Sequence, residues 1–157
     1  MTETVPSLSK RSRVLLADED RLGRAMLKQA INQQPDLEVV GEAHDGYEAL
    51  ELCRRLRPEV VLIEARIPKI DGIEATRRIK RELPETPVLV MNTLVEPDQL
   101  LEALKAGAAG YVLKRSGAQQ IQDAVRGALI GERPLDKETT MELLRRLVDE
   151  ASNGSSH

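Results

Sequence analysis

Charged side chains follow three of the short apolar runs in the sequence, at the point where each run ends. They are Asp18 and Glu19 after the first run, Glu64 after the third and Lys114 after the fifth. Neighbouring carboxylates repel one another and burial raises their pKa, so they are tolerated best around a cation. Two or three carboxylates facing one ammonium group are suited to binding a hard cation such as Mg²⁺.

The elements that must bring these residues together are short strands alternating with helices. Apolar runs with little polar alternation are typical of parallel strands buried on both faces, and the intervening segments are long enough for helical crossovers. The runs are Val14–Ala17, Leu37–Val40, Val60–Ile63, Pro87–Met91 and Tyr111–Leu113. This order predicts a doubly wound α/β domain, whose site lies at the carboxyl ends of the strands.

Local signals mark the helix boundaries. Asp45, Asp71 and Ser116 each precede a Glu or Gln by three residues, which is the pattern of a capping box. Pro97 is suited to the first turn of another helix and Gly107 to its C-terminal cap. We assign a turn or capping role to His44, because it directly precedes the first of these boxes.

The domain boundaries follow from composition. We expect a disordered leader over 1–11, the α/β domain over 12–131, a linker or dimerisation helix over 132–151 and a disordered tail over 152–157. Within the last helix, an apolar stripe recurs at helical spacing. It consists of Met141, Leu144, Leu147, Val148 and Ala151. The stripe either packs back on the domain or serves as a linker or dimer contact, and we favour the second because five helices already cover the sheet.

Composition argues against several classes of function. The chain has no Phe, no Trp and only two Tyr, whereas proteins that stack single-stranded nucleic acid need aromatic side chains. A net charge of −3 without a basic face argues against direct nucleic-acid contact by this chain. We find no signal peptide, no membrane-spanning run and only one cysteine, Cys53, and therefore expect a cytoplasmic protein without a membrane partner.

Three segments resemble the receiver domains of two-component response regulators, most closely those of the NarL/FixJ group. They are VLLADED at 14–20, PEVVLIEARIPKIDG at 58–72 and AGAAGYVLK at 106–114. The resemblance covers 12–131 without gaps between the motifs. It implies a (βα)5 flavodoxin-like receiver fold with a five-stranded parallel sheet of strand order 2-1-3-4-5, followed by a C-terminal linker helix. It also implies a signalling domain in a phosphorelay, not an enzyme.

The resemblance assigns a role to six positions of this sequence. Asp18 and Glu19 match the acidic pair that holds Mg²⁺, and Lys114 matches the lysine that pairs with the phosphoryl group. Glu64 matches the aspartate that receives phosphate and that also serves as a metal ligand. Asn92 matches a Ser or Thr that senses the phosphoryl group, and Tyr111 matches the aromatic residue that changes rotamer. Two of these positions, Glu64 and Asn92, depart from the family pattern in a way that affects the chemistry.

Glu64 is longer than aspartate by one methylene group. In-line phosphoryl transfer depends on precise placement of the nucleophile, so the change predicts an atypical receiver that works without phosphorylation. The longer side chain can reach Lys114 without any phosphate, and Mg²⁺ binding would then be weak or lost. Asn92 has no hydroxyl, but its amide can donate two hydrogen bonds and could hold the Glu64 carboxylate. Drift after loss of phosphotransfer, or a register in which Thr93 takes this position, would also explain Asn92.

Other interpretations remain open at this point. The chain could be an ordinary phosphoacceptor that tolerates Glu64, or Glu64 could be an engineered phosphomimetic. A small-molecule site on the same fold is a third hypothesis, although no glycine-rich phosphate loop is present. The resemblance implies a histidine kinase as partner, which need not still phosphorylate the chain. It also implies control of transcription through a DNA-binding domain absent from this chain, and we expect a homodimer.

Overall fold

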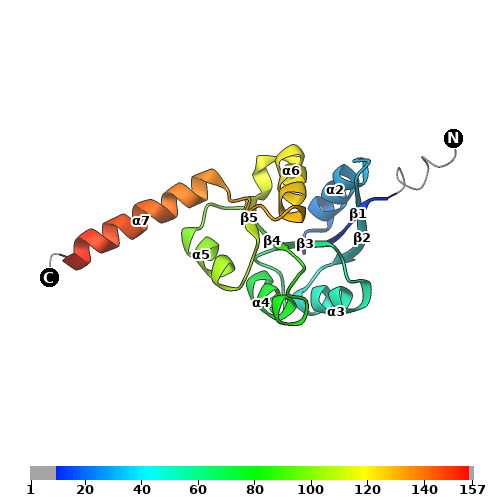
Figure 1. The fold of residues 1–157 in the computed structure, drawn as a ribbon, viewed down its shortest axis with the longest axis horizontal. Helices are drawn as coiled ribbons and strands as arrows, with labels where there is room; N and C mark the ends of the chain where they lie inside the picture. The colour runs from blue at the N-terminus through cyan, green and yellow to red at the C-terminus, as the bar shows by residue number, and fades with distance from the viewer. Residues whose placement is uncertain (1–9, 156–157) are drawn as a thin grey trace.

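The structure is a computed structural model that describes residues 10–155. A parallel sheet with strand order β2-β1-β3-β4-β5 forms its centre (Figure 1). The strands are β1 (Ser12–Ala17), β2 (Leu37–Ala43), β3 (Val60–Glu64), β4 (Val88–Asn92) and β5 (Gly110–Leu113). The doubly wound fold and its strand order are therefore confirmed.

Helices cover both faces of the sheet (Figure 1). One layer contains α2 (Arg21–Asn32) and α6 (Ala118–Leu129), and the other contains α3 (Gly46–Leu56), α4 (Gly72–Glu82) and α5 (Pro97–Lys105). Strand β1 shows how the sequence builds both layers. Val14 and Leu16 pack on the α2 and α6 side, whereas Leu15 and Ala17 pack on the other side, because successive side chains of a strand point to opposite faces.

At two of the three predicted capping boxes, the side chain of the N-cap residue caps the helix. The side chains of Asp45 and Asp71 accept hydrogen bonds of 2.8 Å from the backbone N–H groups of Glu48 and Glu74. The predicted boundaries of α5 are also found, with Pro97 in its first turn and Gly107, at φ +99°, just after its C-cap.

The box predicted at Ser116 is wrong. Lys114–Ser116 forms a short 3-10 turn, η1, so Ser116 does not have the extended conformation of an N-cap residue. Gly117, at φ +95°, takes the N-cap position of α6 instead, and it has no side chain that could cap the helix.

The C-terminal helix, α7 (Lys137–Ser155), starts later than we expected and runs past the boundary at residue 151. The tail expected from 152 onward is thus helical as far as Ser155; residues 1–9 and 156–157 lie outside the described residues. The start has a local cause. The Pro134 carbonyl accepts from Tyr111 N at 2.9 Å, and Asp136 N donates to the Tyr111 carbonyl at 2.8 Å, which holds this segment along β5. The Asp136 side chain then caps α7 by accepting from Thr139 N at 2.8 Å.

Helix α7 packs on the domain through a face different from the predicted stripe. Thr139 and Leu143 are buried, and Arg146 pairs with Asp98 of α5 at 3.1 Å. The stripe itself is exposed, with 53% of Met141 and 64% of Val148 accessible. The alternative in which the stripe packs back on the domain is therefore wrong. Within residues 10–155, no helix is both long and apolar enough to cross a membrane.

Candidate functional site

The structure brings the charged ends of β1, β3 and β5 together at one edge of the sheet. Lys114, just after β5, extends its side chain across the edge toward β3 and β1. Its Nζ donates a hydrogen bond of 2.6 Å to Asp18 Oδ2 and a longer one of 3.3 Å to Glu64 Oε2. The expected contact between Glu64 and Lys114 is thus present, but Asp18 is the closer partner of the ammonium group.

These three side chains are largely withdrawn from water. The side chain of Asp18 is 0% exposed, that of Glu64 13% and that of Lys114 20%. Burial and the neighbouring charge of Asp18 raise the pKa of Glu64 to about 7, although Lys114 acts in the opposite direction. Burial disfavours the charge on Lys114, but its contacts with Asp18 and Glu64 outweigh burial and raise the pKa of Lys114.

The site therefore contains two carboxyl groups and one ammonium group. Lys114 can balance only one negative charge, and its shorter bond goes to Asp18. Near neutral pH, Glu64 is accordingly divided between its protonated and its ionised form. This balance makes Glu64 the group at the site whose charge responds to pH or to a bound cation.

The two acidic residues at the end of β1 behave differently from each other. Asp18 is fixed by a 2.9 Å hydrogen bond from Asp20 N to its Oδ1, and its carbonyl accepts from Arg24. Glu19 is exposed and lines an open hollow with Arg66 and other residues of the β3–α4 loop. The sequence grouped three carboxylates; the structure places two at Lys114 and the third at the outer margin.

Asn92 lies at the end of β4 and is engaged by residues other than Glu64. Its Nδ2 donates to the Tyr111 hydroxyl at 2.9 Å and to Gln99 Oε1 at 2.5 Å, while its Oδ1 accepts from Thr93 N at 2.8 Å. The hypothesis that Asn92 holds the Glu64 carboxylate is therefore wrong, because both amide hydrogens are already used. Thr93 is exposed beyond the strand end, so Asn92 is the residue that occupies the position inside the site.

Tyr111 is 0% exposed and points inward against Asn92. This arrangement includes Gln99 of α5, which sequence reasoning missed. It also missed the ion pair that joins Arg66 to Glu96, at 2.6 Å, across the loops after β3 and β4. A single sequence contains no signal that pairs residues so far apart, although both Glu96 and Gln99 stand at the predicted start of a helix.

Gly72, at the start of α4, packs directly against the backbone of Glu64. Gly72 N donates to the Ala65 carbonyl at 2.8 Å, and a Cβ atom at Gly72 would overlap the Glu64 carbonyl group.

We expect Gly72→Ala to lower the free energy of unfolding by about 2 kcal/mol, because the backbone under Glu64 must move. Urea unfolding measures this change. The control is Gly23→Ala, which meets only the flexible Asp20 side chain and lies within a helix, where we expect no loss. Equal stability of the Gly72 variant and the natural chain would contradict the close packing.

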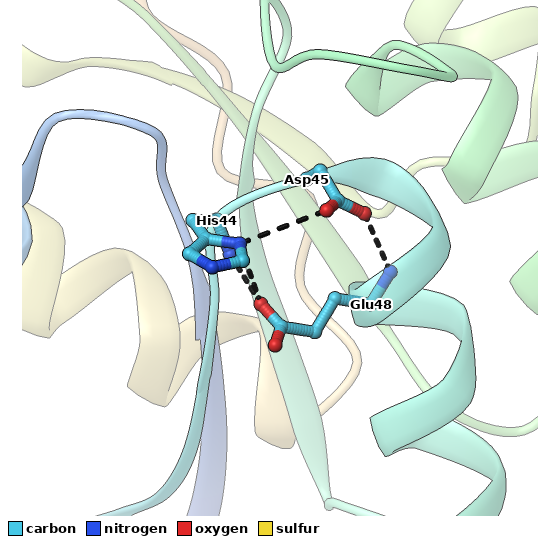
Figure 2. A group of neighbouring side chains, drawn as sticks. All are labelled: His44, Asp45 and Glu48. Carbon is cyan, nitrogen blue, oxygen red and sulfur yellow. Dashed lines mark hydrogen bonds and ion pairs between the residues drawn. The ribbon is translucent and has the colours of Figure 1, made fainter.

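A second group of titratable side chains lies on the surface between β2 and α3 (Figure 2). His44 Nδ1 contacts Glu48 Oε1 at 2.8 Å, and the backbone N–H of His44 donates to the same oxygen. Asp45 caps the helix and pairs with Lys69 at 3.4 Å. Each carboxylate thus has a structural partner and an ammonium group is already nearby, so we interpret the cluster as the N-terminal cap of α3. The role predicted for His44 is confirmed.

Comparison with known families decides what this fold and site belong to. Residues 14–126 match the family model described as response regulator receiver domain. The chain belongs to this family. A receiver domain is a regulatory module rather than an enzyme, and its place in a two-component system implies a histidine kinase as partner.

Curated relatives of this chain are named as regulatory proteins. The transcriptional regulatory protein LiaR of Bacillus subtilis (strain 168) is 39% identical over 145 residues, which is 92% of this chain and 69% of LiaR. The response regulator protein VraR of Staphylococcus aureus (strain NCTC 8325 / PS 47) is 34% identical over 135 residues, which is 86% of this chain and 65% of VraR. The chain therefore spans only about two thirds of the length of each of these relatives.

Solved structures agree with the receiver fold. A two-component response regulator of the LuxR family from Aurantimonas sp. SI85-9A1 has a TM-score of 0.84 and 30% identity, covering 88% of this chain and 99% of that one. The signal receiver domain of the putative response regulator NarL from Mycobacterium tuberculosis has a TM-score of 0.76 and 34% identity, covering 78% and 99%.

Receiver domains typically bind Mg²⁺, and the donor atoms of this site are of the right kind. Asp18 and Glu64 both present carboxylate oxygens close to Lys114 Nζ, and hard cations prefer oxygen ligands. The fit carries one condition. The Lys114 ammonium group contacts both carboxylates, so a cation must compete with it.

Proposed function

We propose that this receiver domain signals without being phosphorylated. The observation that carries the proposal is the 3.3 Å contact between Lys114 Nζ and Glu64 Oε2. In the family, the corresponding lysine pairs with the phosphoryl group on an aspartate. Here the longer Glu64 side chain supplies a carboxylate to Lys114 directly. A contact of this kind can bias a domain that has two states if it is stronger in one state than in the other. The bias equals that difference in free energy.

The rest of the site supports the same proposal. The residue at the Ser/Thr position, Asn92, has no hydroxyl, and its amide is engaged by Tyr111 and Gln99. The aromatic switch residue is thereby held inward. A nucleophile displaced by a methylene group, together with an occupied switch position, is a poor arrangement for receiving and sensing a phosphoryl group.

We propose that any Mg²⁺ bound here is held by Asp18, Glu19 and Glu64, and weakly. The cation has to displace Lys114 from Asp18 and the proton from Glu64, whose pKa lies at about 7. Binding would neutralise the carboxylates that now depend on Lys114. Metal affinity is therefore expected to rise with pH as Glu64 ionises.

The biological role that we propose is control of transcription in the cytoplasm. The longer relative LiaR is named as a transcriptional regulatory protein, and a DNA-binding domain outside this chain would make the contact with DNA. A histidine kinase would recognise the domain without transferring phosphate to it, and a homodimer would be the signalling form. The net charge of the chain is −3, which agrees with a receiver domain that does not contact nucleic acid itself.

Acetyl phosphate with Mg²⁺, followed by intact mass, tests the proposal. We expect the natural chain to keep its mass, because the Glu64 carboxylate is displaced and partly protonated. The matched control is Glu64→Gln, which has no carboxylate at this position. A stoichiometric species heavier by roughly 80 Da in the natural chain, absent in the Glu64→Gln variant, would establish an ordinary phosphoacceptor and overturn the proposal.

A further inference from the structure

We propose that two copies of this chain associate through α7 as a parallel, two-stranded coiled coil. The inference gives the proposed homodimer a specific surface, and it does not depend on the chemistry of Glu64. The exposed apolar stripe of α7 supplies the contact surface. Four features of the helix support its pairing with a second copy.

The first feature is that α7 has two different faces. One face holds Thr139, Leu143 and Arg146 against the domain. Met141, Leu144, Val148 and Ala151 lie on the opposite side of the helix, offset from the first set by roughly half a turn, and Leu147 lies between the two faces. Figure 1 shows the C-terminal half of α7 extending away from the domain. A second helix can therefore approach the stripe without meeting α5.

The second feature is the regular spacing of the exposed apolar residues. Met141, Leu144, Val148 and Ala151 follow one another at intervals of three, four and three residues. Such spacing places them at positions a, d, a and d of a heptad repeat, the pattern that drives two helices to supercoil. All four are exposed, so the seam is available to a partner.

The third feature is the shape of the surface along this seam. An open hollow on α7 is lined by Met141, Leu144, Arg145 and Val148, with Asp149 beside it. In a coiled coil, each core side chain inserts into a hole formed by four residues of the facing helix. The first four of these residues have the spacing of the hole that receives a d residue, so Leu144 of a second copy fits it.

The fourth feature fixes the orientation. A β-branched residue at a together with Leu at d favours two parallel strands, and Val148 and Leu144 supply this combination. In a parallel pair, Arg145 faces Thr140 of the other copy. An antiparallel pair would bring two Arg145 guanidinium groups together, which costs energy because like charges repel.

The seam is short, and this sets the expected affinity. Four partly exposed apolar side chains per copy bury less than the roughly 1,200 Å² that a stable interface needs. We therefore expect a weak dimer whose population rises with concentration. A second exposed apolar pair, Leu22 and Met26 on α2, is the competing surface for self-association.

Sedimentation velocity of the full chain over a wide concentration range tests the inference. We expect the average mass to rise toward that of a dimer, and Leu144→Glu to raise the dimer dissociation constant more than about tenfold. Leu22→Glu is the matched control, since it puts the same charge on the competing apolar pair, and we expect it to leave association unchanged. Circular dichroism shows whether both variants remain folded.

Cross-linking tests the orientation. In a parallel pair, Ala151 of one copy lies next to Ala151 of the other, so Ala151→Cys is expected to form an intermolecular disulfide on mild oxidation. Cys53 does not compete, because it is buried and its pKa is raised to about 12.

Each contrary outcome overturns a different part of the inference. A chain that stays monomeric at every concentration overturns both the dimer and its surface. A dimer lost in Leu22→Glu but kept in Leu144→Glu overturns the α7 surface alone. A dimer in which the Ala151→Cys variant forms no intermolecular disulfide overturns the parallel orientation.

Discussion

Replacing Lys114 with methionine is expected to lower the free energy of unfolding by about 3 kcal/mol above pH 7, because two buried carboxylates then lose the ammonium group that they share. Asp18 is 0% exposed and cannot regain the lost contact from water. Urea unfolding in the absence of divalent cations measures the effect. It is expected to shrink as pH falls toward 7, because without Lys114 the pKa of Glu64 lies still higher and Glu64 takes up its proton first in the variant.

A double variant separates charge balance from packing. Adding Glu64→Gln to Lys114→Met removes one of the two carboxylates, so we expect it to restore about half of the lost stability. Lys105→Met is the matched control, because Lys105 is exposed and pairs only loosely, at 3.8 Å, with Glu102. If the double variant is no more stable than Lys114→Met alone, repulsion between Asp18 and Glu64 is not what Lys114 relieves.

The second large effect concerns pH. Burial and Asp18 raise the pKa of Glu64 from 4.5 to about 7 in the folded chain. Between these two values the unfolded chain releases its proton first, so the stability contributed by protonated Glu64 is present below pH 4.5 and is lost as pH rises through 7. Because one pKa unit corresponds to about 1.4 kcal/mol, the loss is on the order of 3–4 kcal/mol.

Glu64→Gln isolates this contribution. Glutamine keeps the shape of the side chain and cannot ionise, so the variant is expected to match the natural chain near pH 4.5 and to be more stable above pH 7. Carboxyl groups away from the site titrate equally in both proteins, and the difference between their stabilities therefore reports the ionisation of Glu64 together with its effect on Asp18 and Lys114. Unfolding free energies at a series of pH values, with chelator present, give the comparison. Parallel curves for the two proteins would show that the pKa of Glu64 is not raised.

The fold and the convergence of charges were accessible from sequence because both follow from short-range patterns. Apolar runs indicated the five strands, and the carboxyl ends of parallel strands must meet at one edge, which brings Asp18, Glu64 and Lys114 together. The capping boxes at Asp45 and Asp71 were likewise local signals. The strands and these two caps depend on residues a few positions apart, and the convergence of the charges follows from the parallel sheet that the strands form.

What could not be predicted depends on how side chains share their partners. The sequence does not determine which groups the Asn92 amide contacts, so a hydrogen bond to Glu64 was a reasonable expectation. In the fold, Tyr111 and Gln99 accept both of its amide hydrogens. Lys114 Nζ lies 2.6 Å from Asp18 but 3.3 Å from Glu64. This difference likewise depends on the lengths of side chains that come from three strands. Ser116 had the right pattern for a cap and failed because the chain first makes a 3-10 turn.

The central claim is that Glu64, backed by Asn92, prevents phosphorylation of an otherwise intact receiver pocket. The most direct measurement is the intact mass of the natural chain and of the double variant Glu64→Asp with Asn92→Thr, after the same exposure to acetyl phosphate and Mg²⁺. We expect the double variant to gain roughly 80 Da, because Asp18, Glu19 and Lys114 are all retained, and the natural chain to remain unchanged. Phosphorylation of the natural chain at Glu64, or a double variant that stays unmodified although folded, would contradict the account.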